Sequence, residues 1–279
     1  MAAIALPTAR ENLEYGRDMR IAFSERPPDY ENYIFSYHVW GFLEKGESVR
    51  SAYTQGFLPS AYDLSRFYLA RSVRVNLEDL SRTSRIRYTE RKCEQIIQTL
   101  ATRSEFRMSS EWQDLANRYF DAQATRADYR RSRFFEMLDS PLATHVSYLA
   151  DNDTGAAVGF VPVFIRDGIS QYGIPVYDLT YRKVGIGNHM MASTLFQLRE
   201  ENVDHCYLGL CYDTRSLYKT RFPGMQFFNG TKWSGDRGEL HFLLEHQDSL
   251  KEYHLLGYPQ YVDEYGELDP TSLESRMRS

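Results

Sequence analysis

Residues 181–189 read YRKVGIGNH and lie between two kinds of sequence pattern. Residues 171–178 before them are typical of a β-strand, and residues 190–201 after them are typical of a helix. Glycine lets backbone N–H groups approach a ligand closely, and a helix N-terminus leaves N–H donors unpaired at the positive end of its dipole. The junction therefore predicts a phosphate cradle, and a plain glycine turn that caps the helix is the equally common alternative.

The predicted cradle combines charged side chains with backbone donors. The basic side chains would attract phosphate, and the two glycines with the residue after them would donate backbone N–H groups. The predicted donor-binding residues are Arg182, Lys183, Gly185, Gly187 and Asn188.

Three segments after the predicted helix narrow the interpretation. Residues 206–212, CYLGLCY, are typical of a buried strand, residues 214–222, TRSLYKTRF, of a short helix, and residues 229–233 read NGTKW. The pattern Arg-x-x-Gly-x-Gly between strand and helix resembles the pyrophosphate loop of the GNAT acyltransferase superfamily. The three later segments resemble one branch of it, the C-terminal domain of the arginyl- and leucyl-tRNA–protein transferases. The resemblance covers roughly residues 140–245.

The resemblance implies a fold, a reaction and roles for individual residues. The fold would be α+β, a GNAT-like mixed sheet flanked by helices and splayed where the acyl donor enters. The reaction would move an amino acid from aminoacyl-tRNA to an amine. In such an enzyme Tyr218 would protonate the leaving group, and Asp178 would bind the acceptor amine or act as a base. Lys219 and Arg221 would contact tRNA phosphate.

The N-terminal half follows the same branch only in part. Residues 55–58, 66–71 and 82–87 resemble its Gly-Phe, Phe-Tyr and Arg-x-Ser-Arg elements in order and spacing. The cysteine-rich segment of the branch has no counterpart, because Cys93, Cys206 and Cys211 are the only cysteines of the chain. Three thiols cannot form a four-thiolate site, so no metal or cluster is predicted.

Charge is distributed unevenly along the chain. The net charge is −5, but residues 51–134 hold fifteen Arg and Lys against ten Asp and Glu. Residues 236–279 hold four against ten. The basic part favours a surface for nucleic-acid phosphate, and a solvated helical face is the alternative. The predicted tRNA contacts are Arg82, Arg85, Arg87 and Arg91, together with Lys219 and Arg221.

Composition sets the broad class of the protein. A chain of 279 residues can bury a substantial core, and 42% apolar with 25% charged residues is ordinary for a globular protein. No apolar run approaches the roughly 20 residues that span a bilayer, so no membrane partner is expected. Few cysteines and no signal-peptide pattern predict a cytoplasmic protein.

The patterns divide the chain into three regions: residues 1–138, a mixed and partly helical N-terminal region with the arginine-rich segment; residues 139–248, the GNAT-like catalytic core; and residues 249–279, an acidic C-terminal tail. Residues 86–138 read as mostly helical, with Ile96, Ile97 and Leu100 near helical spacing. Strands are predicted at 144–150, 156–165 and 169–178. A last strand pair is predicted at 226–228 and 238–244.

Two enzymatic functions are compatible with these patterns. The favoured one is transfer from aminoacyl-tRNA, as a co-substrate, to the amine of a protein N-terminus or a small molecule. The alternative is an acyl-CoA-dependent N-acyltransferase, which the intact glycine motif favours. A GNAT-like binding module without chemistry is a third, non-enzymatic possibility. None of the three requires a bound cofactor.

Overall fold

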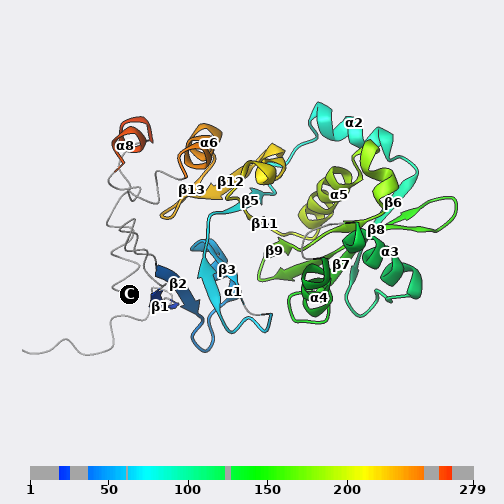
Figure 1. Cartoon of the computed structure of the whole chain (residues 1–279), viewed down its shortest axis with the longest axis horizontal. Helices are drawn as coiled ribbons and strands as arrows, with labels where there is room; N and C mark the ends of the chain where they lie inside the picture. The colour runs from blue at the N-terminus through cyan, green and yellow to red at the C-terminus, as the bar shows by residue number, and fades with distance from the viewer. Residues whose placement is uncertain (1–18, 26–36, 61, 123–126, 248–257, 266–279) are drawn as a thin grey trace, which may run out of the picture.

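The computed structural model describes residues 19–25, 37–60, 62–122, 127–247 and 258–265. A small antiparallel sheet lies at one end of the molecule (Figure 1). Its spatial order is β1-β2-β4-β3. The strands are β1 (Arg20–Glu25), β2 (Tyr37–Phe42), β3 (Phe57–Pro59) and β4 (Phe67–Leu69).

The larger sheet has nine strands in the described part of the chain, in the order β13-β12-β5-β11-β9-β8-β7-β6, with β10 also paired to β8. Every pair in it is antiparallel except β9 with β11. The strands are β5 (Ser72–Asn76), β6 (Ile96–Thr102), β7 (His145–Asp151), β8 (Ala157–Arg166), β9 (Ile169–Tyr172), β10 (Val176–Tyr177), β11 (His205–Leu210), β12 (Met225–Phe228) and β13 (Trp233–Ser234).

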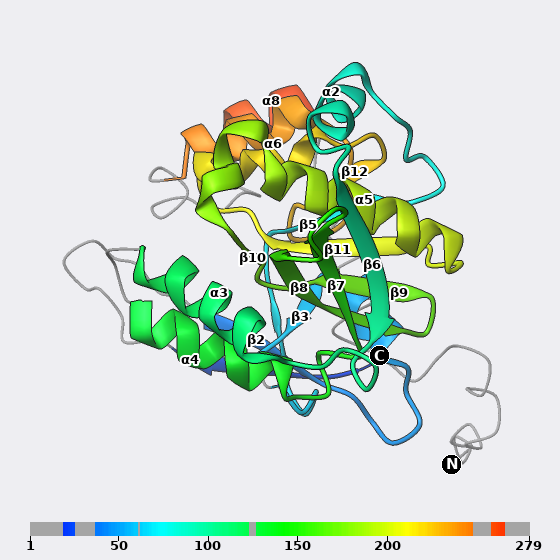
Figure 2. The ribbon, with the colours of Figure 1, turned by 90° about the vertical axis from the view of Figure 1, so that its right-hand side faces the viewer.

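Helices cover both faces of this sheet (Figure 2). Successive strand residues point to opposite faces, so Val161 of β8 packs in one core and its neighbour Phe160 in the other. One core contains residues of α2 (Ser84–Lys92), α5 (Ile186–Glu200), α6 (Arg237–Glu245) and α8 (Pro259–Tyr265). The other contains residues of α1 (Val49–Thr54), α3 (Ser110–Asp121) and α4 (Ala127–Leu138). The predicted fold class, an α+β mixed sheet flanked by helices, is confirmed.

The one parallel pair positions the site. β9 and β11 pair over three residues only, from Ile169 opposite His205 to Gln171 opposite Tyr207. α5 connects these two strands as the crossover helix. Beyond the three paired residues the strands separate, because the segment after β9 forms β10, which pairs with β8. The segments that leave the sheet at this point are η1 (Leu179–Val184) before α5 and η2 (Thr214–Arg221) after β11, both 3₁₀ helices.

The prediction of helix for residues 96–102 is wrong. These residues form β6, which pairs with β7 over seven consecutive residues and lies at the end of the strand order. Ile96, Ile97 and Leu100 fit a helical spacing, but Ile and Thr are β-branched and favour a pleated surface. Pairing with a long neighbouring strand overrides the local pattern. β5 and β6 precede residue 138 and belong to the same sheet as the strands that follow it.

The predicted strand at residues 238–244 is also wrong, because these residues belong to α6. The Asp236 side chain accepts hydrogen bonds from the backbone N–H groups of Gly238 and Glu239, which caps the helix N-terminus. Leu240 and Leu243, three residues apart, then point into the core together. The predicted strand at 226–228 is present as β12, and it pairs with β13 on one side and β5 on the other.

Within the predicted tail 249–279, only residues 258–265 are described, and they include α8. Tyr261 of α8 is buried and donates a hydrogen bond to Glu239 of α6, so this helix packs on the core. The rest of the tail lies outside the described residues. Among the helices that are described, none has both the length and the apolar character needed to cross a membrane.

Candidate functional site

The glycine motif forms a tight turn between two helices. The motif does not follow a strand directly, since η1 lies between β10 and α5 and carries Arg182 and Lys183 in its last turn. Gly185 ends η1 and caps α5 with a φ of 83°, in the left-handed region that favours glycine. α5 therefore begins at Ile186, earlier than the sequence predicts.

This turn already uses part of the predicted cradle. The N–H of Gly185 donates to the carbonyl of Arg182, and the N–H of Asn188 donates to the carbonyl of Gly185. Ile186 and Gly187 occupy the first two helical positions, where N–H groups have no intrahelical acceptor. Fewer backbone N–H groups are therefore free to bind a phosphate than the sequence predicts. The first turn of α5 holds no acidic residue, so its dipole faces a site free of local negative charge.

Gly187 allows a close packing contact. A Cβ at this position would lie 3.2 Å from Cε1 of Tyr177, tighter than most real contacts. The ring of Tyr177 also lies 5.1 Å, centroid to centroid, from that of Tyr119 in α3. Gly187 therefore allows the ring of Tyr177, which packs on Tyr119, to lie close to the N-terminus of α5.

We expect Gly185→Ala to lower the free energy of unfolding by about 1–2 kcal/mol, because an alanine in the left-handed region is strained. The added Cβ itself would make an ordinary contact, 3.4 Å from Thr89. Urea unfolding measures the loss. Gly235→Ala is the matched control, since Gly235 has no positive φ and its nearest neighbour is 3.6 Å away. Equal losses in both variants would contradict the interpretation.

The segment after β11 carries Tyr218. The Asp213 side chain caps η2 by accepting from the N–H of Ser216. Lys219 donates from Nζ to the carbonyl of Leu210 at 2.8 Å, which fastens η2 to the end of β11. Phe222 is buried in the core next to α5. Tyr218, held between these anchors, is 37% exposed.

A cleft of about 420 Å³ lies where the parallel strands separate. The N-terminus of α5, the end of β10 and the segment η2 form its sides. None of the described residues that line it is an Asp or Glu. The lining residues are Tyr119, Pro175, Tyr177, Arg182, Gly185, Gly187, Asn188, Met191, Tyr218 and Arg221.

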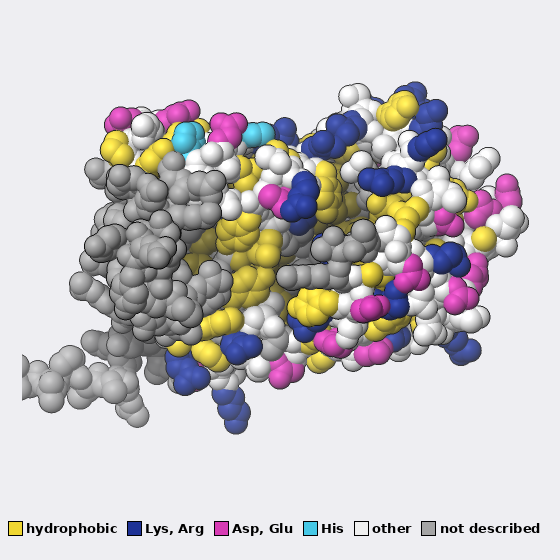
Figure 3. All heavy atoms as spheres, viewed as in Figure 1, with side chains coloured by type: hydrophobic (Ala, Val, Ile, Leu, Met, Phe, Trp, Pro, Cys, Tyr) yellow, Lys and Arg dark blue, Asp and Glu magenta, His cyan; other side chains and the backbone are white. Residues whose placement is uncertain are grey.

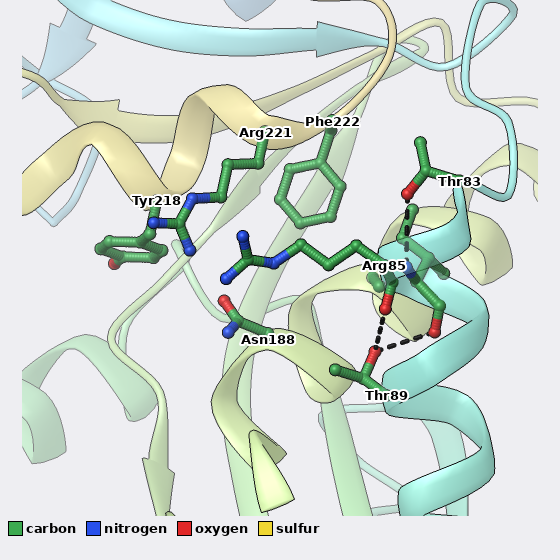
Figure 4. A pocket seen from close by; sticks show the side chains of 9 residues that line it. Thr83, Arg85, Thr89, Asn188, Tyr218, Arg221 and Phe222 are labelled. Carbon is green, nitrogen blue, oxygen red and sulfur yellow. Dashed lines mark hydrogen bonds between the residues drawn. The ribbon is translucent and has the colours of Figure 1, made fainter.

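A second, smaller cavity of about 30 Å³ shares Asn188, Tyr218 and Arg221 with the cleft. It is closed on its far side by α2, which contributes Arg85, and it too has no acidic residue of the described part of the chain in its lining. In Figure 4 the guanidinium group of Arg85 points toward Arg221 and the amide of Asn188. The Lys and Arg side chains of α2 gather on the surface beside it, at the top of the view in Figure 3.

The structure brings six of the predicted site residues to the cleft and a seventh, Arg85, to its edge. The six are Arg182, Gly185, Gly187, Asn188, Tyr218 and Arg221. The predicted base is not among them. Asp178 caps η1, where its Oδ1 accepts from the backbone N–H and the hydroxyl of Thr180.

The remaining predicted contacts lie elsewhere. Arg82 pairs with Glu90 at 3.0 Å and packs over the ring of Phe196. Arg87 donates to the carbonyl of Arg82, and Arg91 lines a shallow surface hollow on the outer side of α2 with Arg87. Lys183 is exposed on η1 and does not line the cleft. Lys219 donates its hydrogen bond to the carbonyl of Leu210.

Sequence patterns do not mark several of the lining residues. Tyr119 is predicted to lie in a helix, as observed, but nothing in its spacing identifies a site. Pro175 and Met191 carry no motif either, and only Tyr177 is suggested by its place at the end of a strand. Among the described residues, no three His, Cys, Asp or Glu side chains are grouped closely enough to hold a metal ion.

No protein-family model matches this sequence, and no curated protein matches it. Solved structures do match by shape. One is the C-terminal domain of a putative lysylphosphatidylglycerol synthetase from Agrobacterium fabrum, with 12% identity, a TM-score of 0.41, and coverage of 74% of this chain and 56% of that one. Another is an L-PGS from Bacillus licheniformis, with 15% identity, a TM-score of 0.38, and coverage of 51% and 46%.

A third is a GCN5-related N-acetyltransferase from Sphaerobacter thermophilus, with 13% identity, a TM-score of 0.32, and coverage of 60% of this chain and 48% of that one. The matched parts span about half of each of these chains. With TM-scores below 0.5, these similarities support no inference about activity. The assignment to the arginyl- and leucyl-tRNA–protein transferase branch stays a prediction.

Proposed function

We propose that the protein transfers an aminoacyl group from aminoacyl-tRNA to an amine. The observation that supports this most is the convergence on one cleft of the N-terminus of α5, Arg182, Arg221 and the side chain of Tyr218. Phosphate oxygens would be held by the guanidinium groups and the helix N-terminus, which places an ester-linked carbonyl beside Tyr218. A cytoplasmic reaction is consistent with three cysteines that are all free and buried.

The transfer reaction requires only the amine, the ester and the hydroxyl group of Tyr218. The nitrogen of a neutral amine attacks the ester carbonyl, a C–N bond forms, and the bond from the carbonyl carbon to the ribose oxygen breaks. Tyr218 gives its proton to the ribose oxygen and regains one from the nitrogen as the amide forms. Among the described residues no carboxylate lines the cleft and Asp178 caps η1, so the proposed steps are written without a separate base.

A second donor, acyl-CoA, is favoured by one observation. The turn at Gly185, Arg182 and the N-terminus of α5 form a compact site that would suit a single pyrophosphate group. Arg85, on α2 at the edge of the cleft, favours the longer polyanion, because an RNA backbone would continue past the reacting end. The proposal is compatible with two acceptors, the amine of a protein N-terminus and the amine of a small molecule.

Co-purification with the donor tests the choice directly. Nucleic acid bound to the purified protein would be detected by its absorbance ratio and identified by sequencing. Coenzyme A would be detected by mass spectrometry. Recovery of coenzyme A without RNA would replace the proposed donor by the alternative.

We expect binding of charged tRNA to weaken by roughly 20-fold between 50 and 200 mM salt. This follows if the guanidinium groups of Arg85, Arg182 and Arg221 together displace about three counterions from a single-stranded end, since the released counterions set the salt dependence. Titrations at the two salt concentrations measure the slope, and acetyl-CoA titrated under the same conditions is the comparison. A flat response to salt would contradict the proposal.

A further inference from the structure

Two arginines from distant parts of the chain face each other without an acidic partner. Arg85 lies in the first turn of α2 and Arg221 ends η2, and both line the small cavity beside the cleft. Neither guanidinium makes an ion pair with a side chain of the described part of the chain. Both side chains are exposed, and among the described residues no Asp or Glu lines this cavity.

Asn188 completes the arrangement. Its side chain comes from the first turn of α5 and lies on the same side of the cavity as both guanidinium groups (Figure 4). Its backbone N–H is used within the turn at Gly185, but no hydrogen bond of the side-chain amide is present among the described residues. An amide donor beside two guanidinium forks is a set of donors suited to one tetrahedral oxyanion.

α2 is held to the core by few side chains. Ile86 and Thr89 are its buried residues, and α2 packs against α5. Arg85 lines the small cavity together with these two residues. An anion bridging Arg85 to Arg221 would therefore tie α2 to η2, the segment that carries Tyr218.

We propose that Arg85, Arg221 and Asn188 form a phosphate clamp that fastens α2 to the core when a ligand phosphate binds. The clamp deepens the proposed function, on which its biological role rests, by adding a phosphate subsite between α2, η2 and the Asn188 side chain of α5. Arg87, only two residues from Arg85, belongs to the outer face of α2 and takes no part. The shared chemistry is a phosphate group, from an RNA backbone or from a nucleotide such as coenzyme A.

Pyrophosphate titration tests the clamp without any transfer reaction. We expect Arg85→Ala and Arg221→Ala each to weaken binding at least 10-fold, and the double variant to lose little more than either single one, because the two side chains share one ligand. Arg221→Lys should recover only part of the affinity, since it keeps the charge and loses the fork. Arg87→Ala is the matched control on the same helix and should bind as wild type does.

Hydrogen exchange of residues 84–92 provides the second measurement. Saturating pyrophosphate should slow exchange of α2 in the wild type and in Arg87→Ala, and leave it unchanged in Arg85→Ala. Repeating the titrations with uncharged tRNA and with coenzyme A identifies the source of the phosphate, because only the true source should lose affinity in Arg85→Ala. Equal weakening by Arg85→Ala and Arg87→Ala would show general charge attraction and overturn the clamp. Failure of aminoacyl transfer would leave these binding results unaffected, so the two proposals fail separately.

Discussion

We expect Tyr218→Phe to slow the chemical step of aminoacyl transfer by about 10²- to 10⁴-fold, the range for a positioned general acid. The substitution removes one hydroxyl and keeps the ring that lines the cleft, so donor affinity should hold. Burial raises the pKa of Tyr218, and Tyr177 and Cys211 raise it further. The hydroxyl therefore keeps its proton at neutral pH, which is the form that a proton donor needs.

The size of the effect also depends on the donor. A ribose alkoxide is a poorer leaving group than a thiolate, so it gains more from protonation as the bond breaks. Aminoacyl-tRNA thus predicts a larger loss in Tyr218→Phe than acyl-CoA does. Single-turnover rates separate chemistry from product release.

Tyr177→Phe is the matched control for this experiment. It removes a hydroxyl from another tyrosine of the same cleft while leaving the aromatic contact with Tyr119 in place. We expect its rate to stay within a few-fold of wild type. A Tyr218→Phe rate that is no lower than the Tyr177→Phe rate would remove Tyr218 from the mechanism.

Strands with strong local signals could be predicted closely from the sequence. β7 and β8 are joined by a turn at residues 151–155, and β8 is an almost unbroken apolar run, so their type and limits agree with prediction within one or two residues. β6 could not be predicted in the same way. Its apolar residues fit a helical period as well as a strand period, and only its pairing with β7 distinguishes them.

The candidate site was predictable where the motif itself carries the chemistry. Arg182, the two glycines and Tyr218 lie at the cleft because the crossover from β9 through α5 to β11 brings both segments to the same edge. Asp178 also lies at the end of a strand, but its carboxylate is used as a helix cap. A sequence pattern does not show whether a carboxylate near a turn is free or already engaged.

The arginine-rich run could be identified from composition. Composition does not show which of its side chains reach the cavity and which lie on the outer side of α2. Arg85 and Arg87 are two residues apart, which in a helix directs their side chains to opposite sides. Arg85 therefore reaches the cavity while Arg87 belongs to the outer hollow. The phase of α2 is set by burial of Ile86 and Thr89, which is a property of the packed core.

The second large effect concerns stability. We expect Glu239→Ala to lower the free energy of unfolding by about 3 kcal/mol, because it leaves buried donors without their acceptor. Glu239 is 4% exposed, and its Oε1 accepts hydrogen bonds from Nδ2 of Asn229 at 2.8 Å and from the hydroxyl of Tyr261 at 2.5 Å. Asn229 in turn accepts from the backbone N–H groups of Thr231 and Lys232, which holds the turn before β13.

The network therefore joins α6, α8 and the β12–β13 turn through one carboxylate, and losing it affects all three at once. Glu239→Gln is the conservative control. It keeps an acceptor oxygen at the same place and should lose clearly less stability than alanine. Urea unfolding gives both values, and limited proteolysis after α6 should show release of α8 in the alanine variant first. If alanine and glutamine lose the same amount, the hydrogen bonds to Asn229 and Tyr261 do not hold α8, and its attachment rests on the ring contacts of Tyr261 and Tyr265 with Phe242.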